Sequence, residues 1–244
     1  MRCDFLKEKI LAIDASGTAC SVAVSDGGKI IGEIFADFKK DHSVSLMPAI
    51  DSLLVRLETN ISEMDYIAAT SGPGSFTGVR IGAATAKGLA YASGKKIIPV
   101  SSLDALASNI SGEFVVPVMD ARRGEVYCAF YCCENGNPKR KSDYFCEDIK
   151  VVIQKLKELG VHAVFTGDGV RAYNDIIKES GFSTAPPHFW AVRASAAAVC
   201  AALNISAAVS VDDFDITYIR KPQAEREYDA RQSRDNSANG ENLK

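Results

Sequence analysis

The alternation of apolar and polar positions predicts a chain in which strands and helices follow one another. Residues 10–13 form an apolar run that ends at Asp14, and residues 20–25 alternate as a strand does. Residues 26–28 (DGG) are a hairpin signal, after which residues 29–38 return as a third strand. We therefore expect three antiparallel strands at the start of the chain.

Two helices and two further strands complete the first half. A helix opens at Ser43 or Ser45, and its apolar stripe has helical spacing, with members Leu46, Met47, Ile50, Leu53, Leu54 and Leu57. A strand at residues 66–70 leads into a glycine-rich turn, at which Ser75 is the expected N-cap of a second helix. An apolar strand at residues 96–100 follows. This order is that of an RNase H-like lobe.

The second half weakly repeats this plan. Residues 114–119 are an apolar strand that ends at Asp120, and residues 126–133 read as the next strand. Helical segments are expected near residues 148–159 and 172–180, with a strand between them and an alanine-rich helix after Arg193. The predicted fold is therefore α/β, with two RNase H-like lobes at residues 1–104 and 105–225, the plan of actin-like ATPases and sugar kinases. Residues 226–244 are polar, and we expect a disordered tail.

Composition narrows the class of protein. The chain has 244 residues, 47% of them hydrophobic, and a net charge of −3 with no dense basic stripe for binding nucleic acid unaided. Its seven cysteines are scattered, as is typical of reduced thiols. The uncharged run 194–211 is mostly alanine and is interrupted by polar residues, so a buried helix is expected there rather than a membrane span. We expect a soluble, cytoplasmic protein without a membrane segment.

The glycine-rich stretch SGPGSFTGVRIG, residues 71–82, invites interpretation as a phosphate loop. A Walker loop requires a lysine and a hydroxyl residue directly after its last glycine, whereas Val79 follows Gly78 here. A helix N-terminus can still bind an anion, but a structural strand-to-helix turn is the favoured interpretation.

Asp14 and Asp120 end corresponding strands of the two lobes, where actin-like proteins hold a nucleotide and its magnesium. The turn after Asp14 contains Ser16 but no lysine, and Arg122 and its neighbour stand where small residues are needed for backbone approach to phosphate. Asp14, Ser16, Asp120 and Arg122 are therefore candidates for a vestigial nucleotide site. Turn stabilisation by Asp14 and a local ion pair at Asp120 are the alternatives. ATP turnover by this chain alone is not expected.

The spacing of histidines, cysteines and serines does not indicate a metal site or a catalytic nucleophile. The three histidines, His42, His162 and His188, lie too far apart to form a helical pair. The cysteines near residue 130 are better explained as buried small side chains, and Ser75 is not in a G-x-S-x-G motif. We predict no catalytic residue, no metal ligand and no cofactor.

The two helices predicted in the first lobe have features that could form a binding surface. One has a broad apolar stripe, and the other carries small residues at three- to four-residue spacing, each interior glycine costing roughly 1 kcal/mol relative to alanine. Packing inside the lobe is one explanation. The other is a protein–protein interface, either homodimeric or with a paralogue. The candidate interface residues are Leu46, Ile50, Leu53, Leu54, Leu57, Gly78, Gly82 and Ala86.

The segments ILAIDASGTACSVAVSDGGKI, DHSVSLMPAIDSLL, SGPGSFTGVRIG, MDARRGEVY and YIRKPQAE resemble the TsaB, or YeaZ, family. The similarity covers about residues 10–225. Members are non-catalytic subunits of the bacterial tRNA threonylcarbamoyladenosine synthase, in the actin-like ATPase superfamily, with degenerate nucleotide and metal sites. The catalytic paralogue, TsaD, has an H-x-x-x-H motif that this chain lacks.

This resemblance implies a scaffold and activator that pairs with TsaD through the two helices of the first lobe and is joined by the ATPase TsaE. The complex would modify adenosine 37 of tRNAs that read ANN codons. Scattered charge suggests that tRNA binds only within the complex, mostly through the partners, and the isolated chain is expected to form a homodimer. The alternatives are a stand-alone small-molecule kinase of this fold and, with less support, a metalloprotease (an M22-type glycoprotease).

Overall fold

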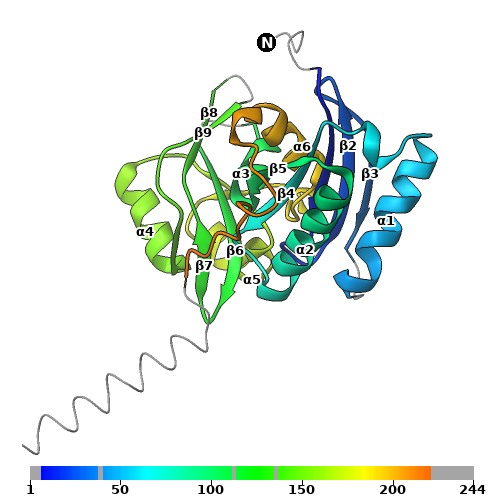
Figure 1. Cartoon of the computed structure of the whole chain (residues 1–244). Helices are drawn as coiled ribbons and strands as arrows, with labels where there is room; N and C mark the ends of the chain where they lie inside the picture. Colours follow the sequence, from blue (N-terminus) through cyan, green and yellow to red (C-terminus); the bar gives the residue numbers. More distant parts are fainter. Residues whose placement is uncertain (1–6, 38–40, 112–113, 135–136, 221–244) are drawn as a thin grey trace, which may run out of the picture.

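The computed structural model describes four stretches of the chain, residues 7–37, 41–111, 114–134 and 137–220. They form two β-sheets, with helices between the sheets and on their outer faces (Figure 1). The predicted disordered tail, residues 226–244, lies outside the described residues.

The first sheet has five strands in the order β3-β2-β1-β4-β5. They are β1 (Lys9–Asp14), β2 (Cys20–Asp26), β3 (Lys29–Ala36), β4 (Tyr66–Gly72) and β5 (Lys96–Ser101). The first three are antiparallel neighbours, whereas β4 and β5 run parallel to β1. Gly27 and Gly28 have φ values of 57° and 78°, as a tight two-residue hairpin requires, so the predicted hairpin is confirmed.

Helices cover both faces of the first sheet, which is why its central strands are apolar at consecutive positions. The outer face carries α1 (His42–Arg56) and α2 (Phe76–Ser93). The inner face, which looks toward the second sheet, carries α3 (Ser102–Ser108) and α6 (Ala194–Ala202). The apolar pattern does not predict the short helix α3.

The second sheet has seven strands, with a main path β10-β7-β6-β11-β12 and with β8 pairing with β6 and β9. The strands are β6 (Val115–Arg122), β7 (Glu125–Cys128), β8 (Tyr131–Glu134), β9 (Asn137–Arg140), β10 (Phe145–Asp148), β11 (Val164–Thr166) and β12 (Ser183–Thr184). Its outer face is covered by α4 (Ile149–Leu159) and α5 (Gly169–Glu179). The main path repeats the order of the first sheet, which confirms the predicted α/β fold with two lobes of RNase H-like order.

The prediction of a single strand at residues 126–133 is wrong. The chain leaves the ladder at Ala129 and Phe130, so that β7 pairs with β6 and β10 while β8 pairs with β9 and the far end of β6. The backbone N–H of Phe130 donates to Ser142 Oγ at 2.9 Å, and its carbonyl accepts from the backbone of Lys141 at 2.7 Å. These bonds satisfy the backbone where the strand breaks.

The end of the described chain crosses back to the first lobe. After α6 comes the short 3₁₀ helix η3 (Ile205–Ala207), and then residues 208–220, here named the return segment. Val209 pairs with Ile97 of β5 in an antiparallel bridge, and Phe214 is buried among the side chains beneath α1 and α2. The predicted boundary at residue 104 falls inside α3.

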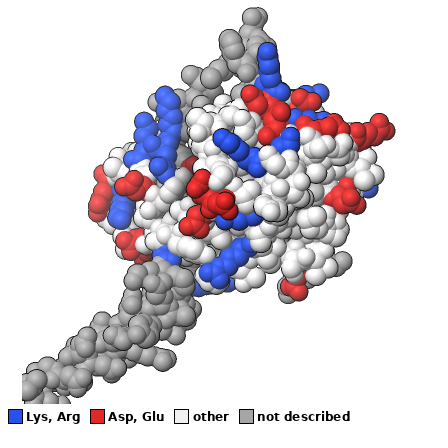
Figure 2. Space-filling view, in the orientation of Figure 1, with Lys and Arg blue, Asp and Glu red and all other residues white. Residues whose placement is uncertain are grey.

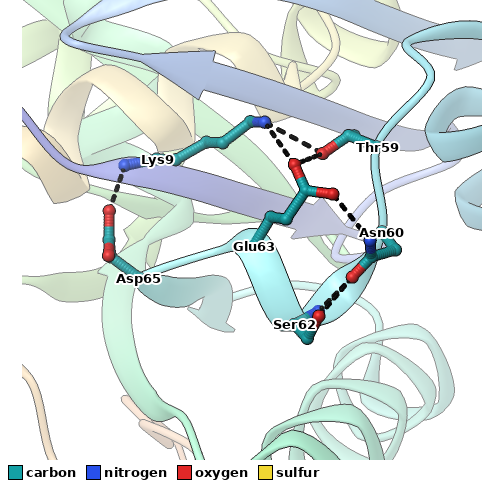
Figure 3. Close-up of polar contacts among 6 residues, drawn as sticks. All are labelled: Lys9, Thr59, Asn60, Ser62, Glu63 and Asp65. Carbon is teal, nitrogen blue, oxygen red and sulfur yellow. Dashed lines mark hydrogen bonds and ion pairs between the residues drawn. The ribbon is translucent and has the colours of Figure 1, made fainter.

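A polar cluster joins the start of β1 to the segment before β4 (Figure 3). It surrounds the 3₁₀ helix η1 (Ile61–Glu63), and its members are Lys9, Thr59, Asn60, Ser62, Glu63 and Asp65. Asn60 Oδ1 accepts from the backbone of Ser62, and Glu63 accepts from Thr59 Oγ1 at 2.9 Å. The hydrogen bonds from Thr59 and Lys9 hold the pKa of Glu63 below its usual value. These contacts form a capping arrangement that fixes the chain entering β4.

Candidate functional site

A cavity of about 850 Å³ lies between the two lobes. Its first-lobe wall comes from the β1–β2 turn and from the glycine-rich loop that opens α2. Its second-lobe wall comes from the β6–β7 hairpin and the start of α5, and residues 216–220 of the return segment close one side. We name this cavity the cleft.

The glycine-rich loop is fixed against the β1–β2 turn by close backbone contact. A β carbon on Gly74 would lie 2.2 Å from the carbonyl oxygen of Ser16, and the backbone N–H of Ser75 donates to that same oxygen at 2.7 Å. Ser75 Oγ accepts from the backbone N–H of Gly78 at 3.3 Å, which confirms the predicted N-cap. The loop is thus a packed strand-to-helix turn that borders the cleft.

Asp14 lies behind the cleft wall and is fully buried. Its Oδ1 accepts from Ser16 Oγ at 2.6 Å and from Thr70 Oγ1 at 2.7 Å, which ties the end of β1 to β4. Burial raises the pKa of Asp14 above its ordinary value, and the hydrogen bonds from Ser16 and Thr70 oppose that shift. Of the four candidate nucleotide-site residues, Asp14 and Ser16 therefore belong to a buried network, while Asp120 and Arg122 line the cleft.

The floor of the cleft is acidic. The backbone N–H of Asp120 donates to Asp168 Oδ1 at 3.2 Å, and Tyr173 Oη donates to Asp120 Oδ1 at 3.4 Å. Burial raises the pKa of Asp168 to about 6, and the neighbouring charge of Asp120 adds to the shift. Two carboxylates at this position disfavour phosphate deep in the cleft unless a cation accompanies it.

Asp168 and Arg171 are site residues that the sequence motifs do not single out. Asp168 stands in a Gly-Asp-Gly turn directly after an apolar strand, and a polar residue in such a loop is a sequence feature that indicates a functional site. Arg171 forms an ion pair with Asp37 of the first lobe, and Thr18 Oγ1 donates to the same carboxylate at 3.0 Å. Partial burial acts to raise the pKa of Asp37, but the hydrogen bonds from Arg171 and Thr18 and the charge of Arg171 together hold it below its ordinary value. No local pattern could reveal this pair, because its members are far apart in the sequence.

Six of the eight candidate interface residues are buried inside the first lobe. Leu46, Ile50 and Leu53 pack beneath α1 against the sheet. A β carbon on Gly78 would lie 2.1 Å from the carbonyl oxygen of Ala15, and one on Gly82 would lie 3.6 Å from Ala15 Cβ. The small residues therefore let α2 approach the β1–β2 turn, and Ala86 is buried on the same side. Leu54 and Leu57 are half-buried.

The outward face of α1 and α2 has a different set of side chains. Val44, Met47 and Val55 of α1 are exposed, and Tyr91 of α2 is 82% exposed. A β carbon on Gly88 would meet no atom within 4 Å, so this mid-helix glycine is not explained by packing within the chain. We name these five residues the outer helix face.

Metal binding and membrane crossing are two further properties on which the described residues bear. Among the residues that the structure describes, no cluster of three or more histidine, cysteine, aspartate or glutamate side chains could hold a metal ion. None of the helices in the described stretches is both long and apolar enough to cross a bilayer.

The paired lobes and the cleft between them define a protein with the architecture of the actin-like ATPase superfamily. A family model described as TsaD, tRNA N6-adenosine threonylcarbamoyltransferase, matches residues 29–228. The YeaZ structure from Pseudomonas aeruginosa superposes with a TM-score of 0.72 at 24% identity, covering 86% of this chain and 99% of that one, and so shares the fold.

Two curated relatives define the family more closely, and both carry the name tRNA threonylcarbamoyladenosine biosynthesis protein TsaB. The protein of Bacillus subtilis (strain 168) is 42% identical over 130 residues, which span 52% of this chain and 56% of the relative. That of Escherichia coli (strain K12) is 34% identical over 178 residues, 71% of this chain and 77% of the relative. The chain belongs to the TsaB (YeaZ) family, as the sequence motifs predict.

Proposed function

We propose that this chain is a non-catalytic scaffold and activator in tRNA threonylcarbamoyladenosine biosynthesis. Its membership of the TsaB family is the observation that carries the proposal. The cleft supports the non-catalytic part. Asp14 is buried and does not line the cleft, whereas Asp120 and Asp168 do. The arginines that line the cleft are each paired with a carboxylate: Arg122 with Asp120, Arg171 with Asp37 and Arg220 with Glu125.

The proposed partner is a TsaD-like catalytic paralogue, with a TsaE-like ATPase joining the pair. We place the paralogue on the outer helix face rather than on the buried residues beneath it. Figure 2 supports this choice, because uncharged side chains cover much of the surface over α1 and α2 in that view. The exposed glycine at position 88 would let a partner helix approach closely. In the absence of the paralogue, a second copy of this chain would occupy the same face.

The experiment that tests the proposal is tRNA modification in a reconstituted system. The catalytic paralogue and the ATPase subunit receive threonylcarbamoyl-adenylate and an ANN-decoding tRNA, with and without this chain. We expect modification only when the chain is present. Equal modification in its absence would overturn the proposal and direct attention to the cleft as a site with an activity of its own.

A further inference from the structure

The β6–β7 hairpin holds two arginines in a backbone conformation that side-chain-bearing residues rarely adopt. Arg122 has a φ of 70° and Arg123 a φ of 58°, and Gly124 follows with 87°. Glycine, asparagine or aspartate fits such positions with less strain. Arg123 and Gly124 form the two-residue turn between Arg122 and Glu125, which requires positive φ, and arginine at such a position is retained at a cost in backbone strain of the kind that concentrates at functional sites.

Arg122 of this hairpin lines the cleft, and Arg123 beside it is exposed. The Arg122 side chain is 86% exposed, and its Nη1 lies 3.3 Å from Asp120 Oδ2, so it is oriented by one carboxylate. Arg123 is exposed and forms no ion pair with any described residue. The hairpin therefore carries exposed positive charge, on Arg122 and Arg123, next to the carboxylates of Asp120 and Asp168 that line the cleft.

On the opposite side of the cleft, the lining residues Phe76 and Tyr218 both contact Arg80, which lies over the ring of Phe76. Arg80 Nε donates to Tyr218 Oη at 3.0 Å, and its Cζ lies 3.6 Å from the centre of the Phe76 ring. Phe76 and Tyr218 are 45% and 46% exposed, with ring centres 6.1 Å apart. Because these side chains are already packed against one another, binding a ligand there would order few additional groups.

Arginine and exposed aromatic rings together suit one class of ligand. Guanidinium groups bind phosphate through paired hydrogen bonds, and exposed rings stack on unpaired bases. Single-stranded RNA combines both groups in one chain. Asp120 and Asp168, which line the cleft, would repel phosphate from its interior and favour phosphate near Arg122 and the exposed Arg123.

We propose that the two edges of the cleft, Arg122 and Arg123 on one side and Phe76, Arg80 and Tyr218 on the other, bind a single-stranded segment of RNA. The inference rests on the proposed function, because the RNA would be the tRNA presented to the complex. Arg122 and Arg123 would contact phosphates, and the stacked group would hold a base.

The test uses the assembled complex and a fluorescein-labelled anticodon stem–loop of an ANN-decoding tRNA. The variant is R122N/R123N, since asparagine accepts left-handed backbone and the hairpin should keep its fold. The matched control is K150Q/K157Q, which removes two exposed charges from α4 on the far face of the second sheet. Fluorescence anisotropy gives the Kd at several salt concentrations.

We expect R122N/R123N to weaken binding about tenfold at low salt and to lower the slope of log Kd against log salt by roughly 1 to 1.5. Tyr218→Ala should weaken binding with little change in that slope, since stacking involves no counterion release. The control should bind as the unaltered chain does. An equal loss in the control would overturn the proposal in favour of non-specific attraction.

Modification of full-length tRNA separates this inference from the proposed function. If the unaltered chain activates the complex but R122N/R123N has unchanged RNA affinity, the RNA contact is wrong and the function stands. Lost activation with unchanged affinity would assign the arginines to a protein partner instead. If the unaltered chain fails to activate, the proposed function falls, and the anisotropy still decides whether these residues bind RNA.

Discussion

The α carbon of Gly78 faces the carbonyl oxygen of Ala15 so closely that an added β carbon would lie 2.1 Å from it. This contact joins the first turn of α2 to the turn after β1. The glycine at position 78 therefore permits close packing inside the first lobe, although glycines at this spacing could also permit the close approach of a partner protein. The same helix contains Gly88, around which a β carbon would meet nothing within 4 Å.

The two glycines should respond in opposite ways to alanine. We expect Gly78→Ala to lower the free energy of unfolding by roughly 1–3 kcal/mol, because the backbone of Ala15 must move to admit the methyl group. Gly88→Ala should raise it by up to about 1 kcal/mol, through helix propensity alone. Urea denaturation of both variants measures the difference. Equal effects would show that the contact with Ala15 does not set the cost.

The outer helix face should control partner binding without controlling stability. Val55→Asp places a charge within the proposed apolar contact, and we expect it to weaken binding of the catalytic paralogue by about tenfold or more. Val151→Asp is the control, because Val151 is also an exposed valine but lies on α4. Isothermal titration calorimetry gives both affinities. If the control weakens binding as much as Val55→Asp does, the partner does not use α1.

Glu33 of β3 caps α6 from the far half of the sequence. Its Oε1 accepts from the backbone N–H of Ser195 at 3.1 Å and from Ser195 Oγ at 2.8 Å, and its Oε2 lies 2.9 Å from Arg193 Nη1. Glu33→Ala removes this cap, and the free energy of unfolding should fall by roughly 1–3 kcal/mol. Glu158→Ala, at an exposed position of α4, should change it little. Thermal and urea denaturation should rank the two variants in that order.

Asp168 should make stability depend on pH. Its pKa in the folded chain is about 6, above the ordinary value of 3.8, so the folded state binds more protons than the unfolded state between these values. The contribution of Asp168 to stability is therefore greatest below the unfolded pKa and is lost as pH rises through 6. Asp168→Asn removes the buried charge, and we expect it to raise the free energy of unfolding by roughly 1–3 kcal/mol at neutral pH. The gain should shrink as the pH falls toward 4. A gain that is independent of pH would contradict the assignment.

Local sequence patterns predict most of the elements that build the cleft. Apolar runs predict β1 and β6, the DGG hairpin has the required positive φ values, and Ser75 caps α2. These features depend on residues that are close in sequence. Periodicity is less informative at the break between β7 and β8, because both segments are apolar and only their pairing partners differ.

Features that depend on long-range contact could not be predicted in this way. The apolar stripe of α1 identifies a buried face, but an apolar stripe alone does not say whether a sheet or a partner covers it. Asp168 and Asp120 meet in the cleft because β11 pairs in parallel with β6, a pairing between strands about 50 residues apart that brings the carboxyl ends of the two strands side by side. The ion pair between Asp37 and Arg171 likewise requires the relative placement of the lobes.

The return segment has a consequence for how the chain acquires its fold during synthesis. The first sheet is formed by the first hundred residues. One of its faces is covered by α6, and Phe214 is buried in the hydrophobic core on the other face. Both are synthesised only after the whole first sheet and all strands of the second sheet. The first lobe therefore cannot complete its hydrophobic core while it is being synthesised. The two lobes must complete their folding together, although the first is synthesised earlier. A premature stop before residue 214 would damage the beginning of the molecule as much as its end.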